Sequence, residues 1–261
     1  MASDPESPNE AKPIVDKGFA EPGYMGYESK GRSKDGSIHK TDEVFNTGSH
    51  FVGTMLAILG TVALIVESSV QRNPWKIVGF SIYGASLIFL FASSTLHHGV
   101  HGSEGVNLAL KTMDYVAIFP LIAGTYTPLV LVFLNQVAVA WAFLIVVWTL
   151  AALGMVVKGV GQDSVPKWFT LTIYVTLGWF AIFLFPYVAP ILGVGGCALM
   201  IVGGVLYTVG GVVFQTEWPN PIPGQLGFHE IWHVFVLAAA TAHWALMWYY
   251  VLPYEQGTAT H

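Results

Sequence analysis

Two histidines with helical spacing are the part of this sequence best suited to binding a metal ion. His229 and His233 stand four residues apart, so on a helix they share one face, one turn from each other. Two imidazoles placed in this way can bind one divalent cation. Zinc accepts nitrogen and oxygen ligands, and a catalytic zinc site keeps one position for water. The alternative for any single histidine here is a ring lying at a polar interface.

Other polar residues could complete such a site. His97, His98 and His101 lie together, and the spacing alone does not choose among them; His97 and His101 are also four apart. Asp114 could be a ligand, a carboxylate that orients a histidine, or a group that holds metal-bound water. Its alternative role is that of a carboxylate favoured by the dipole at a helix N-terminus.

Four further residues are candidates for supporting roles. Ser94 could be catalytic or could be a hydroxyl that packs helices together. Glu43, Asn46 and His50 share one face at helical spacing. For these three, capping and interhelical hydrogen bonding are as well supported as a functional role.

The run His229-Glu230-Ile-Trp-His233 also matches the His-Glu-x-x-His pattern, in which the glutamate is the general base of a metalloprotease. That pattern is short, and it needs a third ligand further along the chain. His243 would lie about 15 Å further along the helix at ~1.5 Å per residue, too far to share the metal. An intramembrane metalloprotease is therefore a weaker hypothesis.

Composition indicates that membrane helices position these residues. Of 261 residues, 54% are hydrophobic and 10% are charged, with a mean hydropathy of +0.58; soluble domains have about 25% charged residues. A span needs ~20 mostly apolar residues. Seven stretches qualify: Gly48–Val66, Ile77–Leu96, Met113–Leu134, Val137–Val157, Trp168–Ala189, Leu192–Phe214 and Ile231–Leu252. The sequence predicts an all-α integral membrane protein, a seven-helix bundle.

The boundary between the fifth and sixth stretches, Pro186 to Pro190, is the weakest; if it were only a kink, the count would fall. The sixth stretch carries three glycine pairs at a spacing near seven: Gly195-Gly196, Gly203-Gly204 and Gly210-Gly211. In lipid, such spacing permits close packing of two helices. Ordinary glycine content is the alternative interpretation.

Positively charged residues near the span ends predict the orientation. With seven spans, one side holds seven of them: Lys30, Arg32, Lys34, Lys40, Lys111, Lys158 and Lys167. The other side holds Arg72 and Lys76. We therefore expect a cytoplasmic N-terminus and an external C-terminus in a multi-pass protein of the plasma membrane. All of the candidate residues except His243 then fall in the cytoplasmic half.

This arrangement predicts three segments: a polar, disordered cytoplasmic tail over 1–42, a seven-helix domain over 43–253, and a short external tail over 254–261. No basic cluster indicates nucleic-acid binding. The only cysteine, Cys197, lies in an apolar run, which excludes an intrachain disulfide framework. The sequence leaves homo-oligomerisation open.

The motifs resemble those of the hemolysin III / progestin and adipoQ receptor family, which includes the adiponectin receptors. The matching stretches are Glu43-Val-Phe-Asn-Thr-Gly-Ser-His50, Ser94-Thr-Leu-His-His98, Met113-Asp-Tyr115 and His229-Glu-Ile-Trp-His233. The resemblance covers about residues 43–252. It implies seven helices with a cytoplasmic N-terminus. It also implies a zinc ion held by His98, His229 and His233, with Asp114 holding a zinc-bound water and Ser94 close by. It favours His98 over His97, because His98 stands four residues after Ser94.

The resemblance further suggests a link to membrane hydrolases that include alkaline ceramidases. The leading hypothesis is therefore a zinc-dependent lipid amide hydrolase, with a ceramide-like lipid or fatty acid as partner. The alternative is a receptor or membrane-homeostasis protein with a structural zinc, in which Asp114 would be the fourth ligand and a protein ligand remains unknown. A channel or transporter is a further alternative.

Overall fold

The computed structural model describes residues 33–37 and 39–255, and this part of the chain is almost entirely helical. The helices are α1 (Glu43–Val70), α2 (Pro74–Gly99), α3 (Glu104–Pro128), α4 (Ala138–Gly161), α5 (Lys167–Trp179), α6 (Ala181–Thr216) and α7 (Phe228–Leu246). π-Helical turns at Leu129–Phe133 and Met247–Val251 extend α3 and α7, and a 3-10 turn at Gln162–Ser164 follows α4. The prediction of an all-helical membrane bundle is confirmed.

Local signals in the sequence explain where the first helices begin. The Asp42 side chain accepts hydrogen bonds from the backbone N–H groups of Val44 and Phe45, which caps α1. Pro74 occupies the first turn of α2, where a missing N–H costs nothing. Short connections then force neighbouring helices to run antiparallel.

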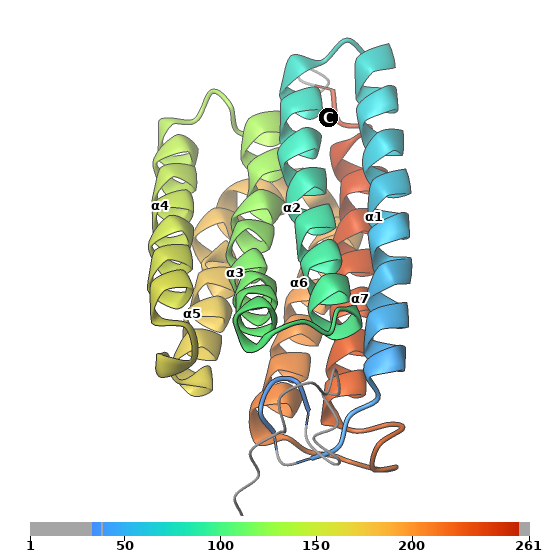
Figure 1. The fold of residues 1–261 in the computed structure, drawn as a ribbon. Coiled ribbons are helices and arrows are strands. Elements are labelled where there is room, and N and C mark those ends of the chain that lie inside the picture. Colours follow the sequence, from blue (N-terminus) through green and yellow to red (C-terminus); the bar gives the residue numbers. More distant parts are fainter. Residues whose placement is uncertain (1–32, 38, 256–261) are drawn as a thin grey trace, which may run out of the picture.

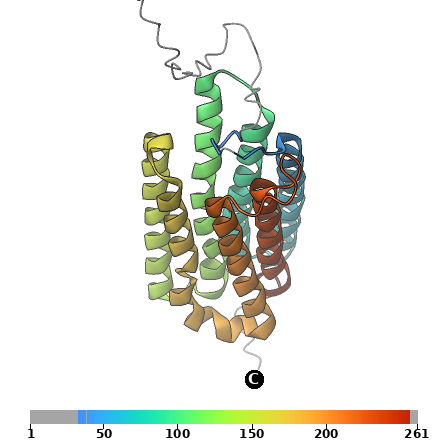
Figure 2. The same cartoon turned by 90° about the horizontal axis from the view of Figure 1, so that it is seen from below.

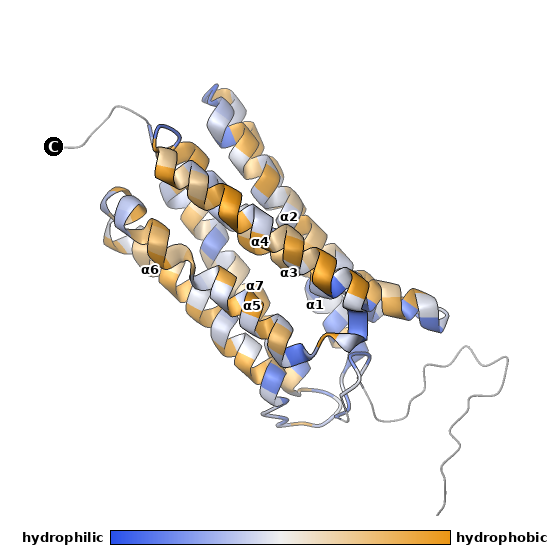
Figure 3. Cartoon of the chain, turned by 90° about the vertical axis from the view of Figure 1, so that its left-hand side faces the viewer, coloured by the Kyte–Doolittle hydropathy of each residue, from blue (hydrophilic) through white to orange (hydrophobic). Residues whose placement is uncertain are grey.

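The outer surface of the bundle is apolar. Large hydrophobic side chains such as Val194, Val160 and Ile182 point away from the protein, with exposed fractions of 90%, 81% and 68%. Hydrophobic colours run along the helices, and hydrophilic colours gather at their ends and in the connecting loops (Figure 3). A surface of this kind requires lipid around it, because water would drive it to aggregate. The protein is therefore an integral membrane protein.

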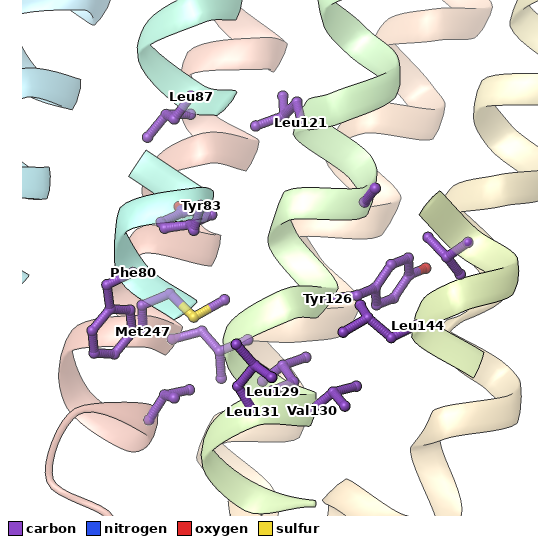
Figure 4. Packing of buried hydrophobic residues seen from close by; sticks show 14 of the residues in the cluster. Phe80, Tyr83, Leu87, Leu121, Tyr126, Leu129, Val130, Leu131, Leu144 and Met247 are labelled. Carbon is purple, nitrogen blue, oxygen red and sulfur yellow. The ribbon is translucent and has the colours of Figure 1, made fainter. Parts of the chain in front are cut away.

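The helices pack in a closed arrangement that places α7 between α1 and α6. α1 packs on α2, α2 on α3 and α6 on α7, while α7 also contacts α1; α4 and α5 lie beside α3 (Figures 1 and 2). The buried core contains aromatic and aliphatic side chains from several of these helices (Figure 4). The start of α1 and the turn at Met247–Val251 that extends α7 lie at opposite ends of the bundle (Figure 1).

The segment from α5 to α6 doubles back on itself. Within the described residues, six helical segments are long and apolar enough to cross a membrane, and one of them, Lys167–Thr216, is 50 residues long. It leaves helical geometry at Gly193, whose φ of 61° is in the region that favours glycine. Trp179 donates to Thr208 Oγ1 at 3.0 Å, so the two arms lie side by side. This reversal supports seven crossings, although the number of crossings and the sides of the termini stay predictions.

The reversal also corrects the expected boundary between the fifth and sixth spans. Pro186 and Pro190 both lie inside α6, and the turn falls at Gly193. Tyr126 of α3 supports the separate break between α5 and α6, where its hydroxyl accepts a hydrogen bond from the Ala181 N–H at 3.0 Å. Prolines in membrane helices are tolerated when neighbouring groups satisfy the freed backbone, so their presence alone did not locate the turn.

The glycine pairs of α6 pack against α7. Gly196, Gly203 and Gly210 are buried, seven residues apart, and a Cβ atom at each would meet a side chain packed on that face. At Gly203 the overlap would be with the ring of His243. The helices are in close contact because these positions carry no side chain.

We expect Gly203→Ala to destabilise the protein and its neighbour Gly204→Ala not to. The new Cβ at 203 would overlap the His243 ring, and such overpacking costs about 1–3 kcal/mol. At Gly204 the nearest atom is Trp179 Cζ2 at 4.0 Å, so alanine fits and its higher helix propensity helps by roughly 0.5–1 kcal/mol. Thermal unfolding of both variants in detergent measures the difference; equal midpoints would contradict this account of the α6–α7 contact.

Candidate metal centre

Three buried histidines meet at one end of the bundle. His98 lies in the last turn of α2, and His229 and His233 lie in the first two turns of α7. One ring nitrogen from each lies within 4.8 Å of the others, and all three side chains are buried. The structure thus brings together the three residues predicted as zinc ligands, and this group could hold a metal ion.

Two of these rings are oriented so that Nε2 carries a free lone pair. His98 Nδ1 lies 2.6 Å from Glu43 Oε2, and a carboxylate only accepts, so Nδ1 carries the proton. His233 Nδ1 lies 3.2 Å from the Ser49 hydroxyl, which donates its own proton to the Asn46 carbonyl and so accepts from the ring. The Nε2 atom of His98 is buried with no partner in the described part of the chain. Metal-binding histidines typically have this arrangement.

A residue outside the predicted site places a carboxylate beside the third ring, at ion-pair distance and without a hydrogen bond. Asp35 Oδ2 lies 3.1 Å from His229 Nδ1, and Asp35 Oδ1 lies 3.3 Å from His97 Nε2. Burial opposes ionisation of this carboxyl group, yet the His229 and His97 rings hold the pKa of Asp35 well below its usual range. Asp35 belongs to the segment expected to be a disordered tail. Residues 1–32 and 38 of that tail lie outside the described residues.

His97 offers an alternative position for the ion. Asp35, His97 and His98 form a second group whose ligand atoms lie within 4.8 Å of one another. His98 Nδ1 already contacts Glu43, so its remaining nitrogen can serve only one of the two groups at a time. His101 is exposed in the loop after α2 and belongs to neither group.

The supporting residues predicted on α1 all contact this centre or its surroundings. Glu43 contacts His98, as described above. His50 stacks on the His233 ring, with centroids 3.7 Å apart and an interplanar angle of 16°. The Asn46 side chain donates to Glu230 Oε1 at 3.3 Å.

Glu230 itself stabilises the start of α7. Its Oε2 accepts from the Gly227 N–H at 2.7 Å, which forms a capping box, and its Oε1 accepts from the Asp42 N–H at 2.6 Å. The side chain is fully buried. With both oxygens occupied by backbone donors, Glu230 is not placed to act as the general base of a metalloprotease.

Asp114 and Ser94 line a small cavity together with one of the three clustered histidines, His229. This cavity, about 60 Å³, is lined by Asp35, His50, Ser94, Asp114 and His229, among others. The Ser94 side chain interacts with the Asp114 carboxylate. Asp114 belongs to neither group of clustered ligand atoms. It therefore faces the space beside the histidines, from a different helix.

A larger apolar cavity adjoins the small one. Its volume is about 260 Å³, and α3, α5, α6 and α7 line it. Six residues line both cavities: Ile118, Leu121, Leu171, Tyr174, Tyr207 and Trp232. His243, the one candidate not expected in the cytoplasmic half, borders the apolar cavity. Its Nε2 lies 3.3 Å from the Met200 carbonyl oxygen.

Comparison with known proteins identifies the family. A family model described as haemolysin-III related matches residues 38–244. The chain belongs to this family. Hemolysin-3 of Bacillus cereus is 34% identical over 213 residues, which cover 81% of this chain and 93% of that protein. The hemolysin-3 homolog of Bacillus subtilis is also 34% identical, with 80% and 94% covered.

Animal proteins are similar at a lower level. The human monocyte to macrophage differentiation factor is 28% identical over 211 residues, covering 79% of this chain and 83% of that protein. The predicted resemblance is thereby confirmed. The three clustered histidines and His97 lie inside the matched region, whereas Lys34 and Asp35 lie before it.

Proposed function

We propose that this haemolysin III-related protein is a zinc-dependent hydrolase of amide-linked lipids such as ceramides. One observation carries the proposal: three histidines cluster together, and one of them, His229, lines a small cavity with a separate carboxylate, Asp114. This small cavity shares part of its lining with a large apolar cavity. Three imidazole nitrogens with a position left for water are typical of catalytic zinc sites. The donor set therefore fits zinc.

Zinc, Asp114 and Ser94 would each have a separate role in amide hydrolysis. Zinc, when bound, would lower the pKa of a water molecule toward ~7 and polarise the scissile carbonyl. Asp114 would accept a proton from the attacking water and pass it to the leaving amine as the C–N bond breaks. Ser94, beside Asp114, would donate a hydrogen bond to the negative charge developing on the carbonyl oxygen.

The apolar cavity would hold the acyl chain. Each buried methylene contributes about 0.8 kcal/mol, so a cavity of 260 Å³ could bind much of a fatty acyl chain. The substrate would enter from the bilayer, with its amide at the end of the bundle where the histidines lie. The proposal keeps the orientation predicted from the lysines and arginines, with this end at the cytoplasmic face of the plasma membrane.

A receptor or membrane-homeostasis role with structural zinc is the second candidate. A structural site is closed by four protein ligands. Asp114, the fourth ligand expected for that role, is absent from both ligand groups, which favours the hydrolase. The metalloprotease hypothesis is disfavoured by the two backbone hydrogen bonds that hold Glu230.

Product analysis tests the proposal. Zinc-loaded protein in lipid nanodiscs, mixed with ceramides of several acyl lengths, should release fatty acid and sphingoid base in equal amounts by mass spectrometry. Removing the metal with a chelator should abolish release. If zinc-loaded protein releases no fatty acid from any amide lipid, the signalling or homeostasis role replaces the hydrolase.

A cavity variant adds a prediction about chain length. Gly178 borders the apolar cavity, and a Cβ placed there meets no atom within 4 Å. Gly178→Leu should therefore fold, narrow the cavity and shift the preferred substrate to shorter acyl chains. An unchanged chain-length profile would mean that the acyl chain does not use this cavity.

A further inference from the structure

A short segment before α1 lies against the metal centre. Residues 33–37 form a turn in which the Gly36 N–H donates to the Ser33 carbonyl at 3.0 Å, with Gly36 at φ +85°. Ser33, Asp35 and Ser37 are buried, each with an exposed fraction of 4% or less. The segment sits at the end of the bundle where α1 begins (Figure 1).

Two anchors fasten this segment to the helices. The Lys34 ammonium donates to the carbonyls of His97, His98 and Val100, at 3.0, 2.6 and 2.9 Å. These are carbonyls at the C-terminus of α2, which have no partner within the helix. The Ser37 hydroxyl donates to Glu217 Oε2 at 2.6 Å, beyond the end of α6. The segment thus joins the ends of two helices across the histidine site.

Between these anchors, Asp35 reaches the histidines. Its two oxygens lie 3.1 Å from His229 Nδ1 and 3.3 Å from His97 Nε2. A carboxylate on the outer nitrogen of a metal-binding histidine fixes the ring and raises its basicity. The other two rings obtain their partners from α1, so among the three rings only that of His229 contacts this segment directly.

We infer that residues 33–37 form a latch that closes the metal centre, with Asp35 positioning His229, so that the latch determines how tightly the ion is held. The inference rests on the metal centre of the proposed function, but not on lipid hydrolysis. The family match begins at residue 38, so the latch is a feature of the chain outside the matched region.

Zinc retention by Asp35→Asn tests the latch. The substitution keeps the size of the side chain and removes its charge. Loss of an outer partner lowers metal affinity roughly 10- to 100-fold. We expect that change in a titration of zinc-loaded protein against a colorimetric zinc chelator, with faster transfer of zinc to the chelator. The matched control is Asp163→Asn, at an aspartate 59% exposed and paired with Lys111 at 2.9 Å, which should behave as the original protein.

A second variant distinguishes the anchoring of residues 33–37 by Lys34 from the effect of the Lys34 charge on zinc binding. Lys34→Met removes a positive charge close to the site, which by charge alone should strengthen zinc binding. It also removes the three hydrogen bonds that hold the segment, so the latch predicts faster zinc release. Slower release from Lys34→Met, or release from Asp35→Asn at the rate of the original protein, would overturn the latch.

These outcomes are distinct from failure of the hydrolase. If the protein holds zinc and hydrolyses lipid while Asp35→Asn retains zinc normally, only the latch is wrong. If Asp35→Asn and Lys34→Met both release zinc faster, yet no lipid is hydrolysed, the latch stands and the hydrolase fails.

Discussion

The purified protein should hold about one zinc ion per chain. Substituting alanine for any one of His98, His229 and His233 should remove most of that zinc. His97→Ala and His101→Ala should retain it. The first three rings are buried, and each offers one nitrogen to a common point. Losing one of three ligands leaves too few donors to compete with water. Metal analysis by mass spectrometry after gel filtration measures the content directly.

The comparison of His97 with His98 is the decisive part of this experiment. Both rings belong to a group that could hold an ion, and the second group contains Asp35. If His97→Ala lost the metal and His98→Ala kept it, the ion would lie nearer to Asp35, and the family pattern in α2 would be shifted by one residue. Thermal unfolding of each metal-free variant provides the control for folding, since a misfolded variant would lose zinc for an unrelated reason.

The helical fold was predictable because the backbone of a segment that crosses lipid can adopt few conformations. A spanning segment must satisfy its own hydrogen bonds, so apolar length alone identified the helices. The turn between the fifth and sixth predicted spans was harder to place. The two prolines led to a predicted boundary at Pro186–Pro190. The chain instead reverses at Gly193, where a positive φ is required. Glycines are frequent in this stretch, so the sequence did not single out Gly193 as the turn.

The site was predictable where its residues share one helix. The spacing of His229 and His233 places both rings on one face, and the structure confirms that they lie together. The partner on α2 was a different problem, because His97 and His98 point in directions that depend on how α2 is rotated against α7. The family pattern chose His98, and the structure shows that both rings lie close to the centre.

Asp35 was missed because its surroundings are polar and lack periodicity. Such composition is typical of disorder. The sequence therefore provided no reason to place Asp35 beside His229, which lies almost 200 residues further along the chain. The only local signal was the Asp35-Gly36 pair, which marks a turn. Glu230 is the opposite case. Its motif is typical of metalloproteases, which the lack of a third ligand made the weaker hypothesis, and the side chain is here a helix cap.

Asp114→Asn should abolish nearly all lipid hydrolysis while leaving the zinc in place. The amide has the shape of the carboxylate but cannot accept a proton from the attacking water. General-base catalysis contributes about 10²- to 10⁴-fold to the rate, so the expected loss is of that size. The three histidines remain, and Asp114 is in neither ligand group, so metal content should not change. Fatty acid release and zinc content, measured on the same preparation, test both parts.

The two measurements together decide between a catalytic and a structural zinc. Retained zinc with lost hydrolysis assigns Asp114 to the reaction, since it lines the cavity beside Ser94 without sharing the ion. Loss of zinc would instead make Asp114 a fourth ligand and favour the receptor or homeostasis role. Full activity in Asp114→Asn would exclude it as the base. Asp163→Asn controls for the loss of a carboxylate as such, because its side chain is exposed and pairs with Lys111 away from the histidines.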